Sequence, residues 1–140
     1  MEINEALDYT RTQTRAVLIT LKSDGRPQSS NVLQWTDADG TVRVSVTDAR
    51  AKVRNVRRDP RVSIHVVADD FWSYVVLEGD AELSPVAAGP DDATVDELVE
   101  YYRALNGEHP DWPDYRAAMV ADQRLVLRLR PRHAYGMTRG

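Results

Sequence analysis

Short segments in which apolar and polar residues alternate constrain the fold of this 140-residue chain more than any other feature. In TVRVSVT, residues 41–47, Val42, Val44 and Val46 point to one side if the segment is extended, and the polar residues point to the other. RVSIHVVA at 61–68 and RLVLRLR at 124–130 alternate in the same way, and RAVLITLK at 15–22 is rich in β-branched residues. Such alternation is typical of antiparallel strands that bury one face.

Turn sequences between these segments favour antiparallel connections. SDGRP at 23–27 precedes a polar strand-like segment, QSSNVLQW at 28–35, and DADG at 37–40 precedes TVRVSVT. Connections of this length are too short for the crossover that parallel strands need. We therefore predict that the first three strands form an antiparallel meander. The longest segment, FWSYVVLEGDAEL at 71–83, can bend at Gly79.

Helical patterns lie between and around the strands. They cover residues 4–13, a basic stretch from Asp48 to Pro60, and two later pieces at 94–107 and 112–122. In the third of these, Thr94 and Glu97 have the spacing of a capping box. We predict a mostly β, α+β fold in a single domain spanning residues 1–140: a barrel or sandwich of about six antiparallel strands with helices packed outside.

Composition excludes several classes of protein. The chain has no cysteine, so it cannot use a thiol nucleophile, a disulfide or a cysteine-ligated zinc site. No apolar run approaches the ~20 residues that a membrane span needs. The polar, acidic start MEINEALDYTRTQ does not have the pattern of a secretory signal. We therefore expect a cytoplasmic protein without a membrane partner.

The sequence carries no standard catalytic machinery. The motifs GxGxxG, GxxxxGK[ST], HExxH and GxSxG are absent. His65, His109 and His133 are scattered without ligand spacing, so no metal site is expected, and the carboxylates single out no catalytic pair. We therefore predict no catalytic side chain, and an enzyme built from this chain would need a cofactor for its chemistry.

Positive charge concentrates in DARAKVRNVRRDPR at 48–61, although the chain has a net charge of −4. Six of its 18 basic residues lie between positions 50 and 61. Asp48 is a candidate N-cap, and Pro60 ends the helix. Arg50 and Lys52 lie in the first turn, where the helix dipole disfavours cations unless an anion is bound. The pattern predicts a phosphate-like ligand at this helix start.

Two other stretches are candidates for ligand contacts. QSSN at 28–31 puts four small or amide side chains on one strand, and about half of them must face inward. Phe71, Trp72 and Tyr74 cluster directly after a turn. These three aromatic residues can pack in a core or an interface, or stack on a flat ligand, and the sequence leaves both interpretations open.

Four segments together resemble the split-barrel flavin and deazaflavin oxidoreductases of the pyridoxamine 5'-phosphate oxidase superfamily. They are GRPQSSN at 25–31, ARAKVRNVRRDPR at 49–61, DDFWSYVVLEGDAEL at 69–83 and DWPDYRAAM at 111–119. The likeness is greatest to the branch that uses the deazaflavin coenzyme F420. It implies a split β-barrel that forms a homodimer, with the cofactor sites in grooves between the two subunits.

The resemblance also implies which residues bind the cofactor. Arg50 and Lys52 would hold its phosphate, with Asn55 as a hydrogen-bonding neighbour. The other basic residues of the helix are Arg54, Arg57 and Arg58, which the helical pattern places on a solvated face. The resemblance implies a second interpretation for these three residues, contact with the acidic glutamyl tail of F420.

The remaining candidates would surround the tricyclic ring. Those from the same subunit are Gln28, Ser30, Asn31 and the strand around Ser45 to Thr47. Those from the other subunit are Trp72, Ser73 and Tyr74.

The function implied is that of an F420-dependent oxidoreductase, a reductase that transfers a hydride from the reduced coenzyme to a small organic acceptor. Two alternatives share the fold: an FMN-dependent oxidase or reductase, and a non-catalytic carrier of F420 or haem. A nucleic-acid binder is a third interpretation, which the net charge of −4 and the pI near 5.3 disfavour. Phosphate-backbone binding depends on a broad positive field.

Overall fold

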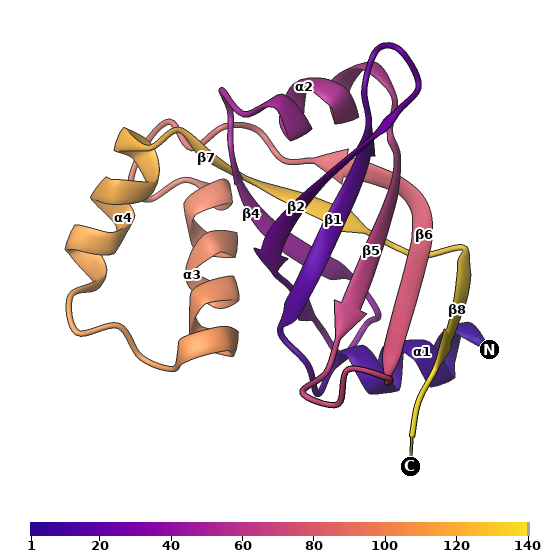
Figure 1. Ribbon diagram of the computed structural model, residues 1–140. Coiled ribbons are helices and arrows are strands. Elements are labelled where there is room, and N and C mark those ends of the chain that lie inside the picture. Colours follow the sequence, from indigo (N-terminus) through magenta and orange to yellow (C-terminus); the bar gives the residue numbers. More distant parts are fainter. Residues whose placement is uncertain (140) are drawn as a thin grey trace.

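The computed structural model describes residues 1–139 as an antiparallel sheet that curls into an open barrel, with helices outside it (Figure 1). The elements in chain order are α1 (Ile3–Thr10), β1 (Arg15–Leu21), β2 (Pro27–Leu33), β3 (Trp35–Thr36), β4 (Val42–Thr47), α2 (Ala51–Arg58), β5 (Arg61–Val67), β6 (Tyr74–Leu83), α3 (Ala93–Asn106), α4 (Trp112–Ala121), β7 (Arg124–Leu129) and β8 (His133–Met137). Hydrogen-bonded strands follow the order β2-β1-β5-β6-β7-β4-β3, and β8 pairs with β6. The predicted mostly β fold with peripheral helices is confirmed. Within these residues the sheet has eight strands, where about six were expected.

The predicted meander of the first three strands is only partly correct, because Trp35, the last residue of the predicted second strand, pairs with Arg43, but residues 28–33 do not pair with the third strand. β1 pairs with β2, but β4 pairs with β3 and β7 instead of β2. The chain leaves the first part of the sheet at Gln34, which is fully buried between β2 and β3. Its side-chain amide donates hydrogen bonds to the carbonyl oxygens of Thr10 and Gln13, at 2.9 and 2.6 Å. These buried bonds fix the point at which the chain crosses into the second part of the sheet.

Strand β6 joins the two parts of the sheet, and it bends where the sequence predicts. It pairs with β5 over residues 74–80 and with β7 over residues 81–83. Gly79 lies at this change of partner, and a Cβ there would lie 3.0 Å from Leu129 Cδ1 and 3.2 Å from the Arg130 carbonyl oxygen. A residue without a side chain therefore lets β7 and the chain after it pass close to the bend.

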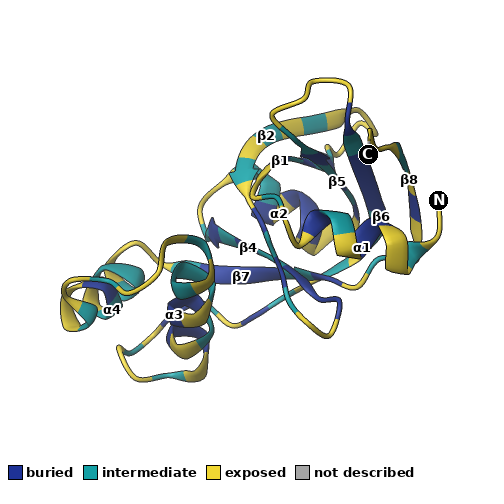
Figure 2. Ribbon diagram, turned by 90° about the horizontal axis from the view of Figure 1, so that it is seen from below, coloured by how far each residue is buried: buried dark blue, intermediate teal, exposed yellow. Residues whose placement is uncertain are grey.

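Alternate side chains of the strands fill the barrel interior, as the sequence pattern predicts. Two strands that pair with each other contribute buried triplets: Val42, Val44, Val46, Leu125, Leu127 and Leu129. Helices α1 and α2 lie at opposite ends of the barrel (Figure 1) and add Leu7 and Val53 to the same cluster. Val126 points outward from β7 but is also buried, because it packs in the cluster formed by α3 and α4. Figure 2 shows β7 and the first half of β6 largely buried and the outer faces of the helices exposed.

Both predicted helix starts are shifted. Helix α2 begins at Ala51, and its N-cap residue is Arg50 rather than Asp48, which instead forms an ion pair with Arg57 at 2.7 Å. Helix α3 is capped by Asp92, whose carboxylate accepts from the amide of Val95 at 2.8 Å. The N-cap of α2 therefore lies two residues after the expected Asp48, and the N-cap of α3 lies two residues before the expected Thr94.

The residues of the expected capping box have other roles. Thr94 donates to the carbonyl oxygen of Pro85 at 2.8 Å. Glu97 accepts from Arg43 of β4 at 2.7 Å and from Arg128 of β7 at 2.5 and 2.7 Å. Glu97 therefore fastens α3 to two adjacent strands of the barrel. No helix among the described residues is both long and apolar enough to cross a membrane.

The pairing of β8 with β6 depends on Gly136. Its φ is +155°, and a Cβ would lie 2.2 Å from the Tyr74 carbonyl oxygen and 2.9 Å from Val75 Cα.

We predict that Gly136→Ala detaches β8 and lowers the free energy of unfolding by about 1–3 kcal/mol. Hydrogen exchange should show the loss of amide protection over residues 133–137. In the control Gly89→Ala, where no atom lies within 4 Å of the added Cβ, protection and stability should stay unchanged. Normal protection of β8 in Gly136→Ala would contradict the prediction.

Candidate cofactor-binding site

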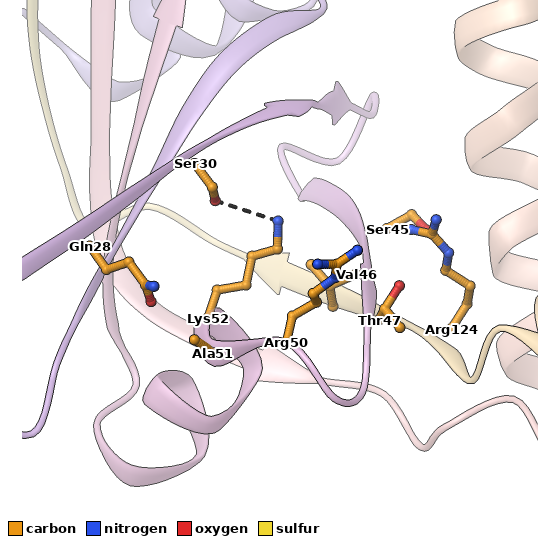
Figure 3. Close-up of a pocket in the computed structure, with 9 residues that line it drawn as sticks. All are labelled: Gln28, Ser30, Ser45, Val46, Thr47, Arg50, Ala51, Lys52 and Arg124. Atoms are coloured by element: carbon orange, nitrogen blue, oxygen red, sulfur yellow. Dashed lines mark hydrogen bonds between the residues drawn. The ribbon is translucent and has the colours of Figure 1, made fainter.

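A pocket of about 440 Å3 lies beside the N-terminus of α2 (Figure 3). This volume is in the range of small-molecule and cofactor sites. The residues that line it come from β2, β4, the start of α2 and β7: Gln28, Ser30, Ser45, Val46, Thr47, Arg50, Ala51, Lys52 and Arg124. The structure thus brings predicted residues of β2 next to predicted residues of β4 and the start of α2.

Strand alternation explains which polar residues face this pocket. In β2, Gln28 and Ser30 are half-buried on one face, whereas Ser29 and Asn31 are exposed on the other. Asn31 is therefore outside the pocket lining, although it lines two neighbouring depressions. In β4, Ser45 and Thr47 face outward from the buried valines, so that their side chains as well as their backbone line the pocket.

The start of α2 gives the pocket its positive charge. Arg50 is the N-cap and makes no capping hydrogen bond with its side chain, so the first amides of the helix point toward the pocket without a side-chain cap. Lys52 extends toward β2, with its Nζ 3.4 Å from Ser30 Oγ, and Arg124 approaches from β7 on the side of Ser45 (Figure 3). None of the lining residues carries a carboxylate. Burial lowers the pKa of Lys52, and the charges of Arg50 and Arg124 lower it further.

The lowered pKa means that the charge on Lys52 opposes folding of the ligand-free protein. Between the lowered pKa and the ordinary value of 10.5, the unfolded chain binds more protons than the folded one, so stability rises with pH in this window. We therefore predict that Lys52→Met stabilises the ligand-free protein at neutral pH by less than about 1 kcal/mol. Urea unfolding should show a smaller gain near about pH 10 than near about pH 7. A loss of stability at both values would contradict the prediction.

Two predicted residues support the pocket from behind. Asn55 is buried, and its amide donates to Gln28 Oε1 at 2.6 Å and to Thr20 Oγ1 at 3.1 Å. Arg58 donates to Asn55 Oδ1 at 3.1 Å and to the Leu21 carbonyl oxygen at 2.6 Å. Neither residue lines the pocket. Together they orient the side chain of Gln28, which does.

The other basic residues of α2 are directed elsewhere. Arg57 is paired with Asp48, and Arg54 donates to the Ala49 carbonyl oxygen at 2.7 Å. Neither lines the pocket.

The candidates expected from a second subunit lie at the other end of the barrel, at the start of β6 (Figure 1). The side chain of Trp72 is 57% exposed. Ser73 is buried, donates to Asp70 and accepts from the Arg139 amide, both at 3.0 Å. The ring of Tyr74 lies 5.2 Å from that of His65. None of these residues lines the pocket of the same chain, so their role in another subunit stays a prediction.

Sequence reasoning missed Arg124. It lies at the start of β7, opposite Thr47 in the strand register, and its Nη1 is 3.4 Å from Ser45 Oγ. The sequence did contain a signal for it, because Arg124 occupies a polar position of RLVLRLR, as Arg128 and Arg130 do. Only the pairing of β7 with β4, which the predicted meander did not contain, brings it to the pocket.

A family model described as pyridoxamine 5'-phosphate oxidase matches residues 3–138. The chain belongs to this family. Its fold is the split β-barrel, as predicted from the sequence.

Solved structures show the same fold at low sequence identity. An F420 reductase is 22% identical, with a TM-score of 0.67, and the match covers 88% of this chain and 90% of that one. A conserved hypothetical protein from Mycobacterium tuberculosis is 21% identical, with a TM-score of 0.73 and coverage of 99% and 85%. The heme storage protein HutZ from Vibrio cholerae is 16% identical, with a TM-score of 0.69 and coverage of 97% and 95%. Proteins with different ligands thus share this family's fold.

The pocket of this family member suits a phosphate-bearing cofactor. Arg50, Lys52 and Arg124 surround it without a neutralising carboxylate, next to a helix N-terminus. The Nε of Arg124 is buried and has no hydrogen-bond partner among residues 1–139. Burial is the main cause of the lowered pKa of Lys52, and an anionic ligand would offset the further lowering by the charges of Arg50 and Arg124. Among the same residues, no group of histidine or acidic side chains is arranged to hold a metal ion.

Proposed function

We propose that this protein is a coenzyme F420-dependent reductase that transfers a hydride to a small organic acceptor. The observation that carries the proposal is the uncompensated positive charge of Arg50, Lys52 and Arg124 in a cofactor-sized pocket of an acidic protein. The likeness to an F420 reductase in fold supports the choice of coenzyme.

Each part of the pocket has a role in this proposal. Arg50, Lys52 and the first amides of α2 would hold the phosphate of the coenzyme. Gln28 and Ser30 would contact its ring system, with Gln28 oriented by Asn55. When bound, the reduced deazaflavin supplies the hydride. The lining residues contain no carboxylate or histidine that could act as a general acid, so the protein contributes position and orientation rather than proton transfer.

Exposed apolar residues in the turn before β6 and on β8 support a homodimer. In the turn, Phe71 is 80% and Trp72 57% exposed, and on β8 Tyr135 is 45% and Met137 49% exposed. We propose that a second copy covers this surface and places its Trp72, Ser73 and Tyr74 beside the cofactor pocket. Analytical ultracentrifugation should give the mass of two chains, and Trp72→Ser should shift the equilibrium toward one. A monomer at micromolar concentration would exclude a composite site.

FMN is the main alternative, because Arg50, Lys52 and the first amides of α2 would also bind its phosphate. Haem is less well supported in this pocket, since none of the lining residues is a histidine, a tyrosine, a methionine or a cysteine that could bind its iron.

The proposal is tested by turnover. Purified protein is mixed with enzymatically reduced F420 and a panel of quinones and enones, and the return of the absorbance of the oxidised coenzyme is recorded. We expect reoxidation faster than in the protein-free control for at least one acceptor class, with little effect from reduced FMN. Protein that purifies yellow and turns over with FMN alone would assign the chemistry to a flavin.

A further inference from the structure

A second depression adjoins the candidate cofactor pocket, on the side of α3 and α4. It has a volume of about 350 Å3 and shares Ser45, Lys52 and Arg124 with the first pocket. Its other lining residues come from the end of β2 and from the two helices: Asn31, Val32, Leu33, Tyr101, Tyr115 and Met119. The two depressions therefore form one continuous groove with a shared polar boundary.

The far wall of this second depression is apolar, aromatic and fixed in position. The hydroxyl of Tyr101 donates to the Leu33 carbonyl oxygen at 2.8 Å, which ties α3 to the end of β2. The hydroxyl of Tyr115 donates to the Leu98 carbonyl oxygen at 2.9 Å, and its side chain is almost fully buried. With Met119 beside them, the rings offer a surface suited to a flat, apolar molecule.

The shared boundary is positively charged, and Arg124 lies at its centre. On one side its charge adds to the effect of burial in lowering the pKa of Lys52. On the other side it opposes the rise in pKa that burial causes in Tyr101 and Tyr115. Only one hydrogen bond from its guanidinium is made among residues 1–139, from Nη1 to Ser45 Oγ at 3.4 Å, and its buried Nε has no partner there. No carboxylate lines either depression.

The chemistry of this guanidinium suits an anionic ligand. In the proposed function, the cofactor phosphate is held by the first amides of α2 together with Arg50 and Lys52. Arg124 is therefore available for a second anionic group. The planar guanidinium can form two parallel hydrogen bonds with a carboxylate, through Nε and Nη2, after a small rotation of the side chain.

We propose that the second depression is the acceptor subsite and that it selects flat aromatic or conjugated molecules that carry a carboxylate, with Arg124 as the residue that recognises the carboxylate. The assignment of the ligand as the hydride acceptor rests on the proposed F420-dependent function. The selection of a flat carboxylate rests only on this groove. Arg124 acts here as a specificity-determining residue, and Tyr101 forms the wall against which the ring packs.

The test compares 2-naphthoate with its uncharged analogue 2-naphthamide by calorimetry with the 140-residue protein. We expect the carboxylate to bind about tenfold or more tightly than the amide. Arg124→Met should abolish this preference. Tyr101→Ala should weaken both probes, whereas Tyr101→Phe, which keeps the ring, should weaken neither by more than about twofold. Circular dichroism and thermal unfolding check that each variant is folded, and Arg124→Lys provides a second variant that keeps the charge and should retain part of the preference.

A second arm separates this site from the cofactor site. In protein saturated with oxidised F420, 2-naphthoate should still bind about tenfold or more tightly than 2-naphthamide. Equal binding of the two probes, an unchanged preference in Arg124→Met, or displacement of 2-naphthoate by F420 would overturn the proposal. If F420 does not bind but the carboxylate preference is present and depends on Arg124, the proposed function fails and the selective site remains.

Discussion

Glu97→Gln should lower the free energy of unfolding by about 2 kcal/mol, because it leaves two half-buried guanidinium groups without their shared carboxylate. The side chain of Glu97 is 15% exposed and holds α3 against β4 and β7 through Arg43 and Arg128. Each arginine keeps one other carboxylate, Asp37 for Arg43 and Glu82 for Arg128, so the loss should be smaller than for an isolated buried pair. Urea unfolding at neutral pH measures the difference.

The matched control is Glu82→Gln, which removes the exposed partner of the same arginine. Glu82 is 74% exposed, so this change should cost less than about 0.5 kcal/mol. Equal losses in the two variants would show that burial does not set the strength of this network.

The effect of Glu97→Gln should also depend on pH. Burial by itself would raise the pKa of Glu97, but the hydrogen bonds and charges of Arg128 and Arg43 outweigh it and hold the pKa below the ordinary value of 4.5. The contribution of the carboxylate is therefore complete above 4.5 and is lost as the pH falls through the lower, folded-state pKa. The stability difference between wild type and Glu97→Gln should narrow in acid. A constant difference down to about pH 2 would contradict this.

Lys52→Met should weaken the binding of F420 by about 10- to 100-fold, because a charge-assisted hydrogen bond to phosphate is worth ~1.5–3 kcal/mol. The same change should stabilise the ligand-free protein, so a folding defect could not explain the loss. The control Arg57→Met removes a neighbouring cation that is already paired with Asp48, and it should weaken binding by less than about threefold. Fluorescence titration of both variants decides the matter. Equal losses, or a larger loss in Arg57→Met, would place the phosphate elsewhere.

Local patterns in the sequence predicted the elements better than their arrangement. Alternation in TVRVSVT and RLVLRLR identified β4 and β7 and their buried faces correctly. It could not show that these strands pair with each other, because residues 48–123 separate them and register depends on the closed sheet. Strand β8 was missed because Pro131 ends β7, and the chain then pairs again with a different strand.

In the candidate site too, local patterns predicted some residues, whereas others depend on how the strands pair. Arg50 and Lys52 could be predicted from a basic helix start in an acidic chain. Strand period predicted only that about half of QSSN faces inward, and the family resemblance named Gln28, Ser30 and Asn31, of which Asn31 does not line the pocket. Arg124 could not be predicted, because only the pairing of β7 with β4 brings it to the pocket. Asn55 does not line the pocket, and its buried position behind Gln28 follows from packing that sequence spacing does not encode.

The most direct test of the central claim is a paired titration of the purified protein with oxidised F420 and with FMN, followed by fluorescence at low and at physiological salt. We expect F420 to bind more tightly than FMN, and we expect added salt to weaken that binding because it screens the charges of Arg50, Lys52 and Arg124. Tighter binding of FMN, or binding of neither cofactor, would contradict the assignment of this pocket to F420.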